Sequence, residues 1–107
     1  MKKLLANYSV FPSGLLINHL SVVGDDGRLL EVAPVTEELA DTLYVPETLC
    51  FIPQDEIARV TRLFEQSVSR ADFVTRFCRL FHPDALADAT VAVLALDFND
   101  RHIARLL

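Results

Sequence analysis

The sequence predicts an α+β domain, and three observations support this fold class. Short aliphatic runs separated by turn residues fill positions 4–52, a pattern typical of a β-sheet. Apolar residues then recur at spacings of three and four over about 55–82, which indicates a two-helix insert. A continuous apolar run of strand length follows at 90–97. Because the strands and helices come in separate blocks, we expect a small, mostly antiparallel sheet or half-sandwich that the C-terminal strand joins.

A single domain is expected over residues 1–107. A chain of this size can bury about two-thirds of its unfolded surface. The composition is 51% hydrophobic and 23% charged, which is typical of a packed core and excludes a disordered chain.

The first three strands are predicted at 4–11, 15–23 and 28–35. The turn between the second and the third strand contains an Asp-Gly pair. Glycine adopts the left-handed backbone of such a turn without strain, so these two strands are expected to pair antiparallel.

A fourth strand is predicted at 43–52, after an acidic segment at 36–41 that forms either a loop or a single helical turn. Proline has no backbone N–H to donate to a neighbouring strand. Pro46 is therefore expected at an edge or a bulge.

Two helices are predicted in the insert, and one continuous helix is the alternative, since the first apolar stripe continues past Val68. The segment from Ser69 to Asp72 resembles a capping box, which favours a second helix starting there. His82 and Pro83 end the helical run. The apolar positions are interpreted as core rather than as a ligand box: Ile57, Val60, Phe64, Val68, Phe73, Phe77 and Phe81.

The C-terminal run from Val91 to Leu96 has no polar alternation, which is typical of a strand covered on both faces. Residues 97–100 are interpreted as a turn in which aspartate and asparagine bind the backbone. Residues 101–107 form either a final strand or a closing helical turn.

Two segments carry a family resemblance: "LLANYSVFPSGLLINHLSVVGDDGRLLEV" at 4–32 and "ADATVAVLALDFNDRHIARLL" at 87–107. They resemble the opening and closing pieces of the β-sandwich, or composite, domain of the amidohydrolase superfamily of metal-dependent hydrolases. The resemblance implies that 91–96 joins the sheet formed by residues 4–52.

In that family a catalytic (β/α)8 barrel lies between the two pieces, and its metal site begins with an H-x-H pair just after the strand that corresponds to 43–52. Such a barrel needs about 200–250 residues. Here residues 54–89 fill the whole interval, and Gln54-Asp55-Glu56-Ile57 stands where the histidine pair would be. The barrel is therefore absent, and no catalytic residue carries over.

The charge distribution argues against a nucleic-acid partner, because the net charge is −5 and neither half of the chain is strongly basic. Arginines are nevertheless dense between residues 59 and 79. They are interpreted either as the solvated sides of helices or as a patch for an anionic ligand or a partner. The residues of this candidate arginine patch are Arg59, Arg62, Arg76 and Arg79.

No catalytic residue, metal ligand or cofactor is predicted. His19, His82 and His102 have no metal-ligand spacing, and Cys50 and Cys78 form no C-x-x-C pair, so both cysteines are expected to be buried reduced thiols. No apolar run approaches the length of a membrane span or of a signal peptide core, so we expect a cytoplasmic protein.

Two functions follow from these features. The first is a non-catalytic small domain with a structural or protein-interaction role, acting as a homodimer, because a helical insert this short leaves part of the sheet uncovered. The alternative is a small hydrolase-like or anionic-ligand-binding protein, with a pocket between the helices and the sheet and with arginines from 59–79 in the site.

Overall fold

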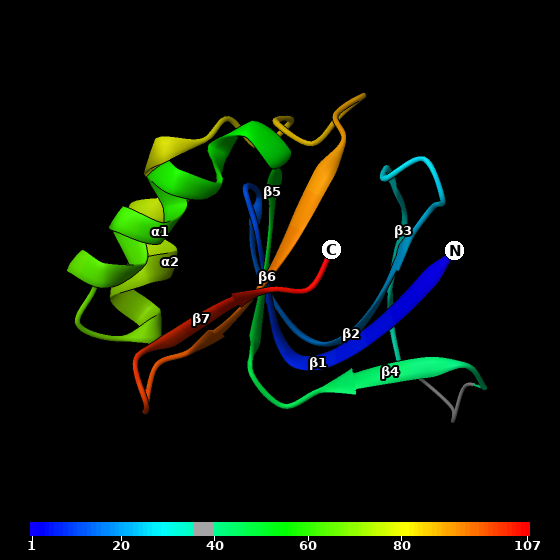
Figure 1. Cartoon of the computed structure of the whole chain (residues 1–107), viewed down its shortest axis with the longest axis horizontal. Helices are drawn as coiled ribbons and strands as arrows, with labels where there is room; N and C mark the ends of the chain where they lie inside the picture. The colour runs from blue at the N-terminus through cyan, green and yellow to red at the C-terminus, as the bar shows by residue number, and fades with distance from the viewer. Residues whose placement is uncertain (36–39) are drawn as a thin grey trace.

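The described residues form one mixed β-sheet with two helices against one of its faces (Figure 1). The computed structural model describes residues 1–35 and 40–107. The α+β class predicted from the sequence is confirmed. The strands are β1 (Lys2–Phe11), β2 (Gly14–Val23), β3 (Leu29–Pro34), β4 (Thr42–Val45), β5 (Thr48–Pro53), β6 (Val91–Asp97) and β7 (His102–Arg105). The helices are α1 (Ile57–Gln66), which a 3-10 turn at Gln54–Glu56 precedes, and α2 (Arg70–Leu80).

The strand order is β3-β2-β1-β5-β6-β7, and β4 also pairs with β1. The β2–β3 pair is antiparallel, as the Asp-Gly turn predicts. The β6 strand pairs antiparallel with β5, so the prediction that 91–96 joins the N-terminal sheet is confirmed. The sheet is less uniformly antiparallel than expected, because β4 and β5 both run parallel to β1. The last residues form a strand, β7, rather than a helical turn.

The strand predicted at 43–52 is divided into β4 and β5 by a bulge at Pro46 and Glu47. Ala6 of β1 pairs with Val45, whereas Ser9 pairs with Leu49, so the β4–β5 side holds one residue more than β1 over this interval. A proline cannot donate to the ladder, so the break falls where it was predicted. The preceding prediction, a loop or a helical turn at 36–41, lies largely outside the described residues.

The first two strands change the face that they turn toward the core near Asn7 and Asn18. Asn18 has a positive φ of 56°, and these two residues are left without a pairing partner in an otherwise continuous β1–β2 register. Phe11 follows Leu4 by an odd number of positions, seven, yet both belong to the same core cluster. A strict two-residue alternation would place them on opposite faces.

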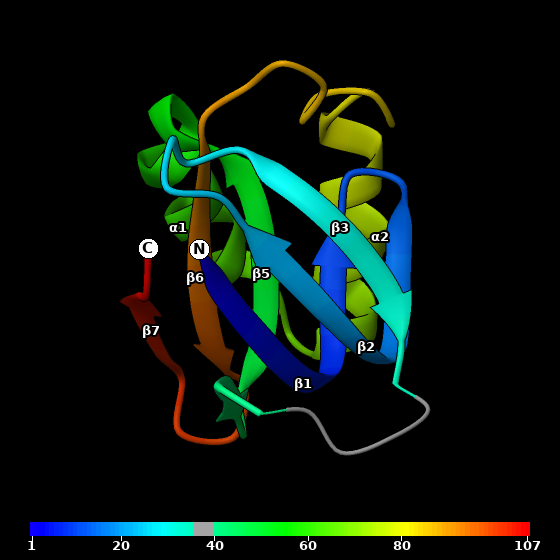
Figure 2. The same ribbon diagram turned by 90° about the vertical axis from the view of Figure 1, so that its right-hand side faces the viewer.

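Two hydrophobic cores result, one on each face of the sheet. The outer core packs α1 and α2 against β5, β6 and the end of β1, and it includes Phe64 and Phe77, as predicted. The inner core lies inside the curl of the sheet, where the rings of Phe11 and Phe51 stack with their centroids 4.6 Å apart. In Figure 2, β2 and β3 lie on the viewer's side of β5, and the turn that joins them passes in front of β6.

A backbone hydrogen bond joins the two ends of the curled sheet, since the N–H of Val91 in β6 donates to the carbonyl of Gly27 in the β2–β3 turn at 2.8 Å.

Ser9 and Ser21 point to the inner face, because they pair with Leu49 and Leu4 of the inner core. Both hydroxyl oxygens are fully buried, and neither has a hydrogen-bond partner among the described residues.

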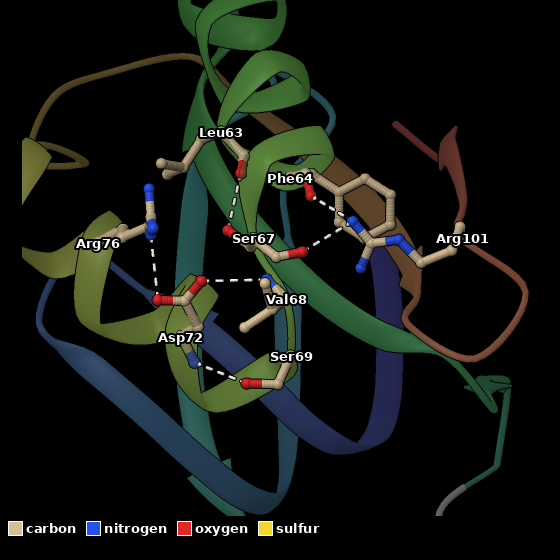
Figure 3. Close-up of polar contacts among 8 residues, drawn as sticks. All are labelled: Leu63, Phe64, Ser67, Val68, Ser69, Asp72, Arg76 and Arg101. Atoms are coloured by element: carbon tan, nitrogen blue, oxygen red, sulfur yellow. Dashed lines mark hydrogen bonds and ion pairs between the residues drawn. The ribbon is translucent and has the colours of Figure 1, made fainter.

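The corner between α1 and α2 is held by side-chain caps (Figure 3). The Oγ of Ser69 accepts a hydrogen bond from the N–H of Asp72 at 3.1 Å, which begins α2 as predicted. The carboxylate of Asp72 accepts from the N–H of Val68 and from Arg76, and these contacts lower its pKa from the ordinary value. The prediction of two helices is confirmed. The placement of Val68 in the core is wrong, because the helix has already ended and this side chain is 85% exposed.

Arg101 caps the C-terminal end of α1 from the β6–β7 turn (Figure 3). Its Nη2 donates to the carbonyls of Phe64 at 2.9 Å and Ser67 at 2.8 Å, and its guanidinium carbon lies 4.9 Å from the centroid of the Phe64 ring. The last carbonyls of a helix have no partner within the helix, so this distant arginine supplies one.

No helix within the described residues is long and apolar enough to cross a membrane.

Candidate functional site

A polar cleft lies where the start of α2, the β4–β5 bulge and the end of β6 meet beside β1. Its volume is about 290 Å³. Four parts of the chain that are distant in sequence form its wall, because the bulge lies opposite Asn7 and Tyr8 of β1 and the start of α2 places Arg70 over the Tyr8 ring. The lining residues are Asn7, Tyr8, Pro46, Glu47, Thr48, Arg70, Leu96, Asp97, Phe98 and Asn99. We refer to this pocket as the Arg70 cleft.

Arg70 is the first residue of α2, and it is positioned by the capped corner described above. Its guanidinium carbon lies 3.5 Å from the centroid of the Tyr8 ring. A position over an aromatic face holds a guanidinium group in place and leaves its N–H donors, which lie in the plane of the guanidinium group itself, available. No ion pair to Arg70 exists among the described residues, so its donors remain available to a ligand.

Two carboxylates share the cleft with this cation. Glu47 comes from the bulge and is partly buried. Asp97 ends β6, and its Oδ1 accepts hydrogen bonds from the N–H groups of Asn99 and Asp100, both at 3.0 Å. These bonds match the turn role expected for this aspartate. The second oxygen of Asp97 and the whole carboxylate of Glu47 take no hydrogen bond from the rest of the described chain.

The chemistry of the lining favours recognition of a charged polar molecule. The lining contains no histidine, cysteine or serine, and its charged side chains are those of Arg70, Glu47 and Asp97. It does offer groups of both charge signs with amide and hydroxyl groups between them. Such a set can bind a small polar molecule that carries both a positive and a negative charge.

The candidate arginine patch is divided over two helices. Arg59 and Arg62 of α1 line a shallow groove of about 190 Å³ together with Leu63, Gln66 and Leu80. Arg59 lies 3.5 Å from the carboxylate of Glu56, and its guanidinium carbon is 5.6 Å from the Phe81 ring centroid.

The other two members of the patch lie on α2, and neither belongs to the lining of that groove. The Nε of Arg76 pairs with Asp72 at 3.0 Å, so its charge is already partnered. Arg79 is exposed on the last turn of the helix.

The histidines and cysteines are dispersed. His82 and His102 are exposed, and His19 lies partly buried in β2 with its Nδ1 2.8 Å from the carbonyl of Ile17. Both cysteines are free. Burial raises the pKa of Cys78 and, more strongly, that of Cys50. Within residues 1–35 and 40–107, no three histidine, cysteine, aspartate or glutamate side chains lie close enough together to hold a metal ion.

Comparisons with models of known protein families, with curated proteins and with solved structures found no match to this chain.

The Arg70 cleft was not predicted from the sequence. Arg70 lies within the arginine-rich stretch 59–79 and Asp97 within a predicted turn, but Tyr8 and Glu47 carry no local signal of a site. The one available indication was the position of Glu47 beside Pro46, because bulges often redirect a side chain at the edge of a pocket.

Proposed function

We propose that this protein is a non-catalytic binding domain and that the Arg70 cleft binds a small zwitterionic molecule. The observation that carries the proposal is the pairing of a stacked, unpartnered arginine with two carboxylates in one cleft between the helices and the sheet. Arg70 would bind the carboxylate of the ligand through two parallel N–H donors, and Glu47 would bind its ammonium group.

The zwitterion replaces the purely anionic ligand of the alternative hypothesis drawn from the sequence. Glu47 and Asp97 oppose a second negative charge in the same cleft, and a ligand with an ammonium group turns this repulsion into attraction. A cleft of about 290 Å³ is at the lower end of the range for small-molecule sites, which favours a ligand the size of an amino acid.

Two observations support a non-catalytic role. The lining of the cleft contains no histidine, cysteine or serine, and no H-x-H pair follows the strand that ends at Pro53. We propose that the sheet is related to the composite domain of those hydrolases, supported by the return of the chain after the helices to add β6 beside β5. Two free thiols support a reducing compartment such as the cytoplasm.

Thermal shift with matched probes tests the ligand class. Free amino acids form the first set, and each one that binds is compared with its N-acetyl derivative, which keeps only the negative charge, and with its amide, which keeps only the positive one. A ligand at about 100 times its Kd stabilises the folded state by about 2.7 kcal/mol. We expect this stabilisation from a free amino acid and its loss with either blocked derivative.

Variants locate the binding site. Arg70→Met and Glu47→Gln should each abolish the shift, while Arg79→Met, on the exposed last turn of α2, should leave it unchanged. Binding of the N-acetyl derivatives alone would instead support the anionic ligand. No shift with any probe, or a shift that survives in Arg70→Met, would contradict the proposal.

A further inference from the structure

The outer face of β1, β2, β3 and β4 carries an apolar row that the helices do not cover. Residues paired across neighbouring strands point to the same side of a sheet. Leu5 pairs with Leu20, Leu20 pairs with Ala33, and Leu5 also pairs with Tyr44, so these four side chains lie in one row across four strands. The opposite face at this position holds the inner core.

This row is open to solvent. Leu5, Leu20 and Ala33 are partly exposed, and Tyr44 is 52% exposed. Figure 1 shows both helices at the other end of the sheet, against β5 and β6. Figure 2 looks onto this outer face, and no helix stands in front of β1, β2 or β3.

A second row, two residues further along each strand, carries charge of both signs. Lys3 of β1 pairs with Val22 of β2, and Val22 pairs with Glu31 of β3. Lys3 and Glu31 therefore lie at the same height on either side of β2. Neither forms an ion pair within residues 1–35 and 40–107.

Over β1, β2 and β3, these two rows are complementary to themselves under a two-fold rotation. The axis runs parallel to β2, midway between the two facing copies. Rotation about it leaves the position of every residue along the strand direction unchanged and places β1 of one copy opposite β3 of the other. Lys3 of each copy then faces Glu31 of the partner subunit, and the larger Leu5 faces the smaller Ala33. Leu20 meets its own equivalent on the axis. A C2 interface requires this self-complementarity of one patch, and face-to-face sheets pack with nearly aligned strands about 10 Å apart.

We propose that the outer face of β1–β2–β3 is the contact surface of a homodimer, and that its occupant is a second copy of this chain. The charge complementarity of Lys3 and Glu31 and the large-to-small match of Leu5 and Ala33 select this occupant over an unrelated partner. The surface is separate from the Arg70 cleft, so the dimer does not depend on the proposed ligand.

Sedimentation equilibrium over a range of protein concentrations tests the dimer. The full chain should show twice the mass of one 12.0 kDa chain. Lys3→Glu replaces two attractive pairs per dimer by two repulsive ones and should raise the dissociation constant about tenfold or more. The double variant Lys3→Glu with Glu31→Lys should restore the original constant, because it rebuilds both pairs with the charges exchanged.

Two further variants complete the test. Leu20→Lys sets two like charges against each other on the axis and should give a monomer, whereas Arg79→Glu, remote from the face, should leave the constant unchanged. Circular dichroism of each variant checks that it is folded. A monomer at all concentrations, or a dimer that Lys3→Glu leaves intact, would overturn the proposal, as would a double variant that fails to recover.

Discussion

Replacing Arg101 by methionine tests the cap that holds the β6–β7 turn to the end of α1. Methionine keeps an unbranched apolar stem of similar length and removes the guanidinium group. The variant loses the two hydrogen bonds to the carbonyls of Phe64 and Ser67, at 2.9 and 2.8 Å, and the contact with the Phe64 ring. Arginine and methionine must adopt the same left-handed backbone at position 101, where φ is 56°. The backbone strain is therefore nearly the same in the wild type and the variant.

The expected loss in the free energy of unfolding is about 1–2 kcal/mol. A hydrogen bond from a charged donor contributes about 1.5–3 kcal/mol when it is shielded from water, and a cation at a helix C-terminus adds about 0.3–1 kcal/mol. Arg101 is an exposed residue, so water can replace part of both contributions and the sum must be discounted. In a domain near 100 residues, each kcal/mol lowers the melting temperature by about 4–8 °C.

Urea denaturation followed by far-UV circular dichroism measures this loss as a lower midpoint with an unchanged slope. Arg101→Lys keeps the charge without the two-carbonyl contact and should fall between the wild type and Arg101→Met. Arg79→Met removes an exposed arginine from α2 and should change the free energy of unfolding by no more than about 0.5 kcal/mol. If Arg101→Met behaved like Arg79→Met, the capping argument would be refuted.

Two further predictions concern buried polar groups of the sheet. Ser21→Ala removes a buried hydroxyl that has no partner among the described residues, so we expect the free energy of unfolding to rise by about 1 kcal/mol, with exposed Ser13→Ala as the control; a fall of that size would show that the hydroxyl is bonded. Burial, with the Cys78 thiol nearby, raises the pKa of Cys50 well above the ordinary 9.0, so the folded state retains this proton longer than the unfolded state does. Stability should therefore fall as the pH rises above about 9.0, and urea midpoints across this range should fall less steeply in Cys50→Ala; identical slopes in the two proteins would contradict this.

The elements of the fold were predictable because their signals are local. The Asp-Gly turn, the change of apolar period after residue 54 and the Ser69 cap each act within a few residues, and each gave the correct element. Val68 was misplaced because apolar periodicity continues through the helix corner, whereas the backbone does not.

The arrangement of the sheet and the position of the cleft were harder to predict from the sequence, because they depend on contacts between distant segments. In β1 nearly every residue around Asn7 is apolar or aromatic, so the sequence does not mark the point where the strand changes the face that it turns to the core. The Arg70 cleft combines four segments whose meeting depends on one extra residue at the bulge. Among several arginines of similar sequence context, only the tertiary structure distinguishes Arg70, which stacks on Tyr8, from Arg76, which is paired with Asp72.

The position of β1 at the centre of three pairings has a consequence for the time course of folding. Its antiparallel partner β2 follows immediately in the chain, and a hairpin of this kind closes within about 1–10 μs. Its parallel partners are distant in the sequence, since Ser9 pairs with Leu49. The β5 strand in turn pairs with β6, which follows both helices in the chain. Closing these long loops loses chain entropy before it gains contacts, so we expect docking of β5 on β1 to limit the folding rate. Until then β1 presents an unpaired edge, which is the period in which this chain is most exposed to misassembly with other copies.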